Sequence, residues 1–134
     1  MLDVLGNRGE DFLMGEIKSY KDLRIWRLGI DIVKAVYLVT RNFPKSETYG
    51  LASQMRRAAI SIPSNIAEGH NRYHRKEFSQ FLNIALGSCG ELETQTLIAK
   101  ELGFINENDF DSLENLLDNE GKQIRALIAK MTST

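Results

Sequence analysis

Residues 54–69 read QMRRAAISIPSNIAEG, and this stretch combines features that a simple surface helix would not combine. On a helical wheel of about 100° per residue, one face from Leu51 to Ile66 is apolar. An adjoining flank carries three more uncharged side chains around one cation: Tyr49, Arg56, Ile60 and Ala67. The apolar arc spans roughly 200°, whereas a helix that faces one core needs about 100°. The excess predicts a second contact surface, and we expect a copy of the same chain to cover it.

Pro63 lies within the same helical pattern. Proline removes one backbone hydrogen bond and crowds the preceding turn, so we expect it to bend the helix. The alternative is a break, with a new helix that starts at Pro63.

Four segments of the chain show helical periodicity, and no stretch alternates at period two. Short loops between long helices predict an all-α, antiparallel, up-down-up-down four-helix bundle over residues 18–134. Residues 1–17 show no sustained pattern and are predicted to be a disordered N-terminal extension. The helices are expected over residues 20–41, 46–68, 73–103 and 107–131.

Specific residues are predicted to end the helices and to face the core. Ser46 or Thr48 should cap the second helix, and Asn106 or Asn108 the fourth. The predicted core seam of the first helix consists of Leu23, Trp26, Ile30, Val33, Tyr37 and Thr40. The seam of the second is Leu51, Met55, Ala58, Ile62 and Ile66. The seam of the third is Phe78, Leu82, Ala85, Cys89, Leu92, Thr96, Ala99 and Leu102. That of the fourth is Phe110, Leu113, Leu117, Ile124, Leu127 and Met131.

Gly87 and Gly90 lie in the middle of the third predicted helix. Each should cost about 1 kcal/mol relative to alanine. Close approach of another backbone is the expected compensation, and a merely weakened helix is the alternative.

The composition excludes several classes of protein. Apolar residues at 43% and charged residues at 26% are typical of a globular domain. Seventeen basic and eighteen acidic residues give a net charge of −1, so the chain is not strongly cationic. The single cysteine excludes an intrachain disulfide. Neither a membrane span nor a signal-peptide core is apparent, which favours a cytoplasmic location without membrane contact.

A basic cluster is expected around the connection between the second and third helices. Cations beside an aromatic ring can hold phosphates and stack on bases, so we predict contact with RNA or DNA. The alternative is a solvated turn whose cations pair with Glu68 and Glu77. The candidate nucleic-acid residues are Arg57, Arg72, Tyr73, Arg75 and Lys76.

Catalytic and metal sites are not predicted. His70 and His74 are four residues apart, but a helix end separates them and no carboxylate precedes them in the usual order. Cys89 lies on a core seam, where a thiol is inert. Glu91 and Glu93 point to different faces of one helix. We therefore expect no enzyme activity, no metal and no cofactor.

Four blocks carry a family resemblance: YKDLRIW (20–26), FPKSETYGLASQMRRAAISIPSNIAEG (43–69), EFSQFLNIALGSCGELETQ (77–95) and AKELGFI (99–105). They resemble the four-helix-bundle family of 23S rRNA intervening-sequence proteins, a broad group that includes the accessory variability protein of diversity-generating retroelements. The resemblance covers about residues 18 to 131. It implies a ring-like homopentamer and, in the retroelement branch, a basic accessory that binds a reverse transcriptase and nucleic acid. The positions that match the family pattern are Tyr49, Gly50, Arg56, Arg57, Asn65 to Gly69, Glu77 and Phe78.

Two hypotheses follow. The first is a non-enzymatic homo-oligomeric accessory protein that associates with nucleic acid. The second is a protein–protein interaction scaffold that contacts only itself and another protein. In both, Arg56 should make an ion pair or carbonyl contacts at the subunit interface. The candidate interface residues are Tyr49, Arg56, Ile60, Ala67, Gly87 and Gly90.

Overall fold

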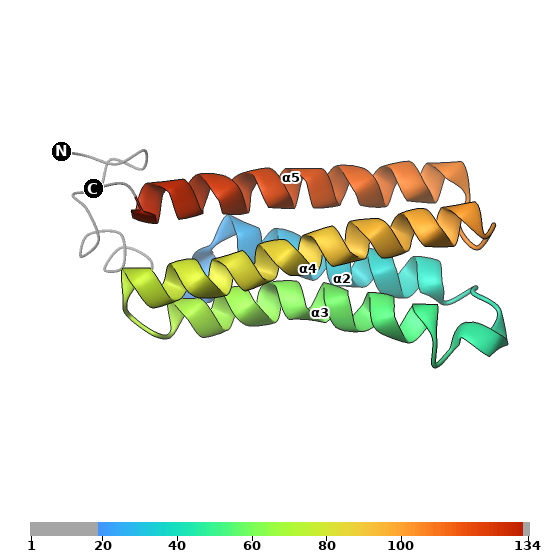
Figure 1. The fold of residues 1–134 in the computed structure, drawn as a ribbon, viewed down its shortest axis with the longest axis horizontal. Helices are drawn as coiled ribbons and strands as arrows, with labels where there is room; N and C mark the ends of the chain where they lie inside the picture. The colour runs from blue at the N-terminus through green and yellow to red at the C-terminus, as the bar shows by residue number, and fades with distance from the viewer. Residues whose placement is uncertain (1–18, 133–134) are drawn as a thin grey trace.

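The computed structural model describes residues 19–132, so the predicted disorder of residues 1–17 lies outside the described part of the chain. Four antiparallel helices lie side by side (Figure 1): α2 (Arg24–Thr40), α3 (Leu51–His70), α4 (Arg75–Glu101) and α5 (Glu107–Thr132). Each helix packs against its neighbour in sequence, and α5 also packs against α2. Short 3-10 turns, η1 (Tyr20–Asp22) and η2 (Lys45–Glu47), precede α2 and α3. The predicted all-α four-helix bundle is confirmed.

The start of α3 differs from the prediction. Neither Ser46 nor Thr48 caps it, because η2 occupies this stretch and α3 begins only at Leu51. The Leu51 N–H instead donates to Glu47 Oε1 at 3.1 Å. A carboxylate at this end also interacts favourably with the helix dipole. Glu47 therefore takes the role that was expected of the hydroxyl residues.

The turn between α4 and α5 follows the sequence signals closely. Gly103 has φ +79°, a left-handed conformation that costs glycine little. Its N–H donates to the Lys100 carbonyl at 2.9 Å, and the Phe104 N–H donates to the Ala99 carbonyl at 2.8 Å. These two bonds form a Schellman motif. Asn106 Oδ1 then accepts the Asp109 N–H at 2.7 Å, so the predicted cap of the fourth helix is confirmed.

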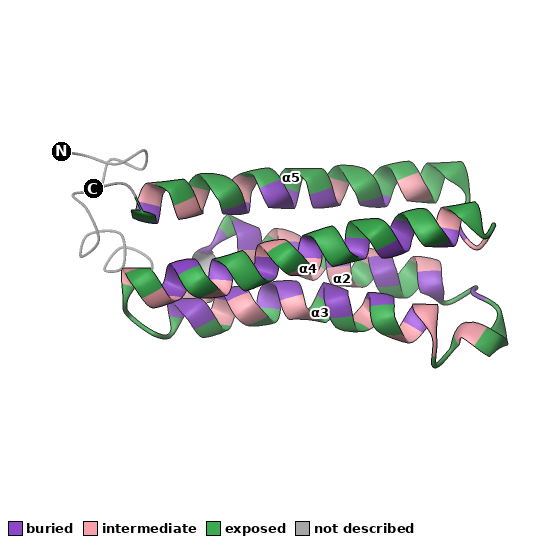
Figure 2. Ribbon diagram, in the orientation of Figure 1, coloured by how far each residue is buried: buried purple, intermediate pink, exposed green. Residues whose placement is uncertain are grey.

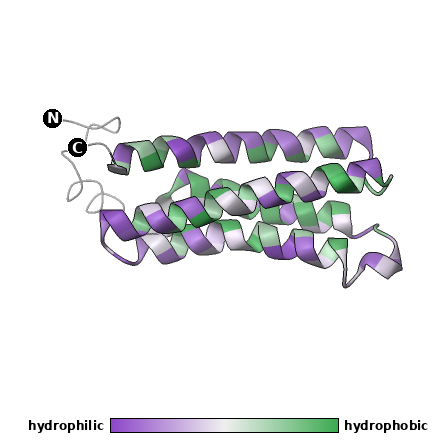
Figure 3. Ribbon diagram, viewed as in Figure 1, coloured by the Kyte–Doolittle hydropathy of each residue, from purple (hydrophilic) through white to green (hydrophobic). Residues whose placement is uncertain are grey.

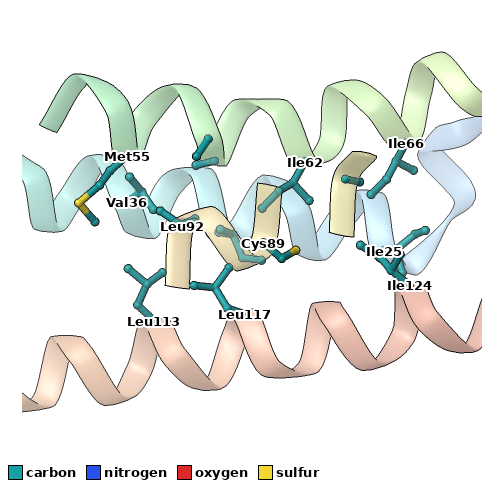
Figure 4. Close-up of a cluster of buried hydrophobic side chains, with 14 of the residues drawn as sticks. Ile25, Val36, Met55, Ile62, Ile66, Cys89, Leu92, Leu113, Leu117 and Ile124 are labelled. Atoms are coloured by element: carbon teal, nitrogen blue, oxygen red, sulfur yellow. The ribbon is translucent and has the colours of Figure 1, made fainter. Parts of the chain in front are cut away.

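The core lies where the four helices face one another. Figure 4 shows side chains of α2, α3, α4 and α5 pointing into this common space. The predicted seams of α3, α4 and α5 are largely confirmed, with Leu51, Phe110 and Leu127 half-buried at their edges. Leu102 is wrong as a core residue, because it follows the end of α4 and is 58% exposed.

The predicted seam of the first helix is rotated by one position. The residues of α2 that the structure buries are Ile25, Gly29, Ile32, Val36 and Thr40. Of the predicted set, Trp26, Ile30 and Val33 are only half-buried, and Tyr37 is 39% exposed. Leu23 and Thr40 are buried as expected. The predicted stripe of Trp26, Ile30, Val33 and Tyr37 therefore lies at the margin of the core, partly open to solvent.

Pro63 is buried inside a continuous helix, so the alternative of a helix break is wrong. A Cβ placed on Gly29 would lie 3.2 Å from Pro63 Cβ and 3.3 Å from Pro63 Cδ. The absence of a side chain at Gly29 thus lets the proline ring approach the α2 backbone. This close contact holds α2 against the middle of α3.

Candidate nucleic-acid and subunit interfaces

The connection between α3 and α4 contains a strained, exposed aromatic residue. Tyr73 has φ +64° and is the one described non-glycine residue with positive φ. A side chain in this region costs about 1–2 kcal/mol. Tyr73 is nonetheless 75% exposed, so its side chain gains little packing within residues 19–132 to offset the strain. Such an outlier motivates a functional hypothesis for this turn.

Cationic side chains surround Tyr73. Arg72 donates to Glu68 Oε1 at 2.7 Å, and its guanidinium carbon lies 5.2 Å from the centre of the Phe81 ring. Arg75 and Lys76 begin α4, where the helix dipole adds positive potential. An open depression of about 620 Å³ lies beside them. Its lining residues are His74, Arg75, Lys76, Ser79, Gln80, Met131 and Thr132.

Arg57 does not belong to this cluster. It is exposed on α3, thirteen residues before His70, which corresponds to about 20 Å along the helix axis. The structure brings Arg72, Tyr73, Arg75 and Lys76 together and leaves Arg57 apart. The Arg72–Glu68 pair is the contact expected for a solvated turn, so one of the cations is already balanced.

Arg56 makes contacts within its own chain. Its Nε donates to Thr40 Oγ1 at 2.9 Å, and its guanidinium carbon lies 4.6 Å from the centre of the Tyr37 ring. Ile60, one turn along the same side, is 41% exposed. Ala67 is half-buried. Tyr49, which precedes the first residue of α3, is 95% exposed. The flank that adjoins the buried face of α3 therefore remains partly open.

Gly87 and Gly90 are exposed on α4. A Cβ placed on either residue would find no atom within 4 Å. No backbone of this chain approaches them among the described residues, so compensation inside the monomer is excluded as the reason for the two glycines. Contact with a second chain and a merely weakened helix remain as explanations.

The remaining candidate groups do not assemble into a reactive site. Burial, aided by the negative charges of Glu120 and Glu93, raises the pKa of Cys89 to about 12, so the thiol stays protonated and unreactive. His70 is buried, and its ring lies in a T-shaped arrangement with that of Phe78, at 5.9 Å between ring centres. Within residues 19–132 no three His, Cys, Asp or Glu side chains are grouped so that they could hold a metal ion.

Glu120 is an ionisable core residue that the predicted seam of the fourth helix does not include. It is 0% exposed, and burial raises its pKa to about 8. Its Oε2 lies 3.2 Å from the position that a Cβ on Gly29 would occupy. The signal was present, since Glu120 falls between Leu117 and Ile124 on the core seam of α5.

The model of the 23S rRNA-intervening sequence protein family matches residues 21–126. The chain belongs to this family. The resemblance stated from the sequence is therefore confirmed at the level of the family.

A solved structure supports the same fold. The chain is similar to a protein of unknown function from the S23 ribosomal protein family of Bacteroides thetaiotaomicron, with a TM-score of 0.71 and 23% sequence identity. The match covers 78% of this chain and 95% of that chain. No curated protein matches the sequence. Among the described helices, none is long and apolar enough to cross a lipid bilayer.

Proposed function

We propose that this family member is a non-enzymatic, homo-oligomeric accessory protein that binds RNA or DNA at the turn between α3 and α4. The observation that carries the nucleic-acid part is Tyr73, which is held exposed in a strained conformation between Arg72 and the cationic start of α4. A ring in this position can stack on a base while the neighbouring cations hold phosphates. The reducing cytoplasm is the proposed setting.

Self-association is the second part of the proposal, and the family resemblance makes a pentamer the expected form. Each chain offers only a few cations, and such binding is weak and sensitive to salt. Several copies of the turn on one assembly would act together through avidity. Association therefore explains how a chain of net charge −1 can hold a polyanion. By the same resemblance, a reverse transcriptase is a candidate protein partner.

A nucleic-acid titration tests the turn. We expect labelled single-stranded RNA or DNA to bind the wild-type protein at low salt, with an affinity that falls steeply as salt rises. Combined Arg72→Glu and Lys76→Glu substitutions should weaken binding roughly tenfold or more. The matched control is Arg27→Glu with Lys34→Glu, which reverses two exposed cations on α2. Fluorescence anisotropy measures both.

Tyr73→Gly separates nucleic-acid binding from stability when the same titration is combined with thermal unfolding. Glycine relieves the left-handed strain, so the melting temperature should not fall, while the loss of the ring should weaken binding. Wild-type protein that ignores both RNA and DNA at low salt would overturn the proposal. An equal loss in the turn pair and the control pair would show that net charge, not this turn, governs binding.

The second candidate function is a protein–protein interaction scaffold. The Arg72–Glu68 ion pair favours it, because it lowers the positive charge that the turn can offer to phosphates. In that case the protein still associates with itself, but salt-dependent nucleic-acid binding is absent at every concentration that the titration reaches.

A further inference from the structure

Two surfaces on different sides of the bundle are apolar and uncovered within the described chain. The first is the outer groove between α2 and α3. Trp26, Ile30, Val33 and Tyr37 form one stripe on α2, and Tyr37 stacks on Arg56 of α3, so this stripe borders α3. Ile60 lies on the α3 side of the groove. We define the outer groove by these residues: Trp26, Ile30, Val33, Tyr37, Arg56 and Ile60.

The second surface is the outer face of α4. Ile84 is 51% exposed and Ile98 is 44% exposed, with the two open glycines between them. The ribbon of α4 carries hydrophobic and weakly polar residues where that of α5 is mostly hydrophilic (Figure 3), and much of this α4 surface is exposed (Figure 2). We define the α4 face by Ile84, Gly87, Gly90, Glu91, Thr94 and Ile98.

We propose that the α4 face of one copy docks in the outer groove of the next copy, so that Ile60 enters the space left by Gly87 and Gly90 while Arg56 pairs with Glu91. This inference rests on the proposed self-association and specifies which surfaces meet. Residues at i, i+3, i+4 and i+7 of a helix surround a hole that accepts a side chain of a facing helix. On α4 these are Gly87, Gly90, Glu91 and Thr94.

The heights of the residues along the bundle agree with this pairing. Ser61 Oγ lies 2.8 Å from Ser88 Oγ, which places residue 61 of α3 level with residue 88 of α4. Because the two helices are antiparallel, Ile60 is level with residue 89, between the two glycines. In a ring whose axis is parallel to the helices, all copies lie at one height. Ile60 of one copy then meets the glycine hole of the next within about 3 Å along the axis.

The charges of the two surfaces are complementary. Arg56 contacts Thr40 and Tyr37, and it takes no part in the ion pairs Arg72–Glu68, Lys100–Glu107 and Lys122–Asp118 of the described chain. Glu91 is the one acidic residue of the α4 face, is exposed, and takes no part in these ion pairs either. In the same register, residue 58 of α3 is level with Glu91 of α4. Arg56 is therefore offset from Glu91 by two residues along α3. That offset is about 3 Å, within reach of both side chains.

The pairing is heterologous, because the groove and the α4 face are different surfaces. Each copy would offer its α4 face to one neighbour and its groove to the other. Contacts of this kind close into a ring when the rotation allows it. A contact between two identical surfaces would stop at a dimer.

Disulfide cross-linking tests the pairing directly. Chains with both Ile60→Cys and Gly87→Cys should give a ladder of covalent multimers on a non-reducing gel after mild oxidation. Either substitution alone should give none, since its partner cysteine is absent. The wild type controls for Cys89, which is buried. Dimers from Ile60→Cys alone would instead show groove against groove, and would overturn the proposal.

Charge exchange provides an independent readout. Arg56→Glu and Glu91→Arg should each weaken assembly at least tenfold, and the two together in one chain should restore it. Glu93→Arg is the matched control, because Glu93 lies outside the α4 face. It lines an open depression between α4 and α5 together with Asp111, Glu114, Asn115 and Asp118. Far-UV circular dichroism checks that each variant is folded.

The outcomes distinguish the two levels of the inference. An oligomeric wild type whose double-cysteine variant forms no ladder and whose charge exchange restores nothing would sink this pairing and leave self-association standing. A monomeric wild type would remove the proposed assembly itself, and the pairing with it.

Discussion

Replacing Glu120 by glutamine should abolish most of the pH dependence of stability between pH 4.5 and about 8. In the wild type, the free energy of unfolding should fall by about 1.4 kcal/mol for each pH unit in this window. In Glu120→Gln it should stay nearly level. Urea titrations at a series of pH values measure both slopes.

The sign follows from the burial of the carboxyl group. Burial raises the pKa of Glu120 from 4.5 to about 8, and neither carboxyl oxygen has a hydrogen-bond partner in the described structure. Below pH 4.5 the group is protonated in both states. Above it the unfolded chain loses the proton while the native chain keeps it, so rising pH favours unfolding until the native group also ionises near pH 8.

The other buried acid near Glu120 does not confuse this test. Burial, aided by Glu120 and Glu93, raises the pKa of Cys89 to about 12 against the opposing effect of Arg125, so the thiol keeps its proton throughout the window. Glutamine retains the shape of the side chain and removes only its titration. If wild type and variant lost stability equally as the pH rose, Glu120 would not be the buried neutral acid that the structure indicates.

Gly69→Ala should destabilise the protein by about 1–2 kcal/mol, although alanine is the better helix former by about 1 kcal/mol. Gly69 is buried near the end of α3. A Cβ there would lie 2.7 Å from Phe81 Cβ and 3.0 Å from Phe78 Cδ1. Phe81 Cβ is fixed by its own backbone, so α3 and α4 would have to separate beside the basic turn. Thermal and urea unfolding measure the loss.

Gly87→Ala is the matched control. The substitution and the gain in helix propensity are the same, but no atom lies within 4 Å of the new Cβ. Measured in an Arg56→Glu background and below its association concentration, so that the copies are separate, this variant should gain about 1 kcal/mol. A stabilised Gly69→Ala variant would contradict the close α3–α4 contact at this position.

Much of the fold could be predicted from the sequence because three of the four seams are unambiguous. On α4, the predicted seam positions from Phe78 to Ala99 repeat at helical spacing, and all of these seam residues are buried. On α2, two stripes have identical spacing: Ile25, Gly29, Ile32, Val36 and Trp26, Ile30, Val33, Tyr37. Periodicity cannot choose between them, and the small Gly29 makes the true core stripe the less hydrophobic one. The choice depends on Pro63, which packs against Gly29 from another helix.

The candidate site was less predictable for a related reason. Arg72, Tyr73, Arg75 and Lys76 are neighbours in sequence, so their proximity in the turn follows from the chain itself. The sequence pattern predicts that Arg57 joins them, but thirteen residues of α3 separate it from His70 at the turn. The left-handed conformation of Tyr73 has no sequence signal, since tyrosine rarely adopts it. Neither carboxyl oxygen of Glu120 has a hydrogen-bond partner in the described structure. This feature depends on how the helices pack in three dimensions, so the linear sequence pattern does not contain it.

The mass of the wild-type protein in solution tests the central claim most directly, because both proposals depend on association between copies. Light scattering coupled to size exclusion should give a whole-number multiple of the 15.2 kDa chain mass, with five copies as the form that the family resemblance implies. The multiple should persist on dilution to micromolar concentrations. A species of 15.2 kDa under the same conditions would contradict the account.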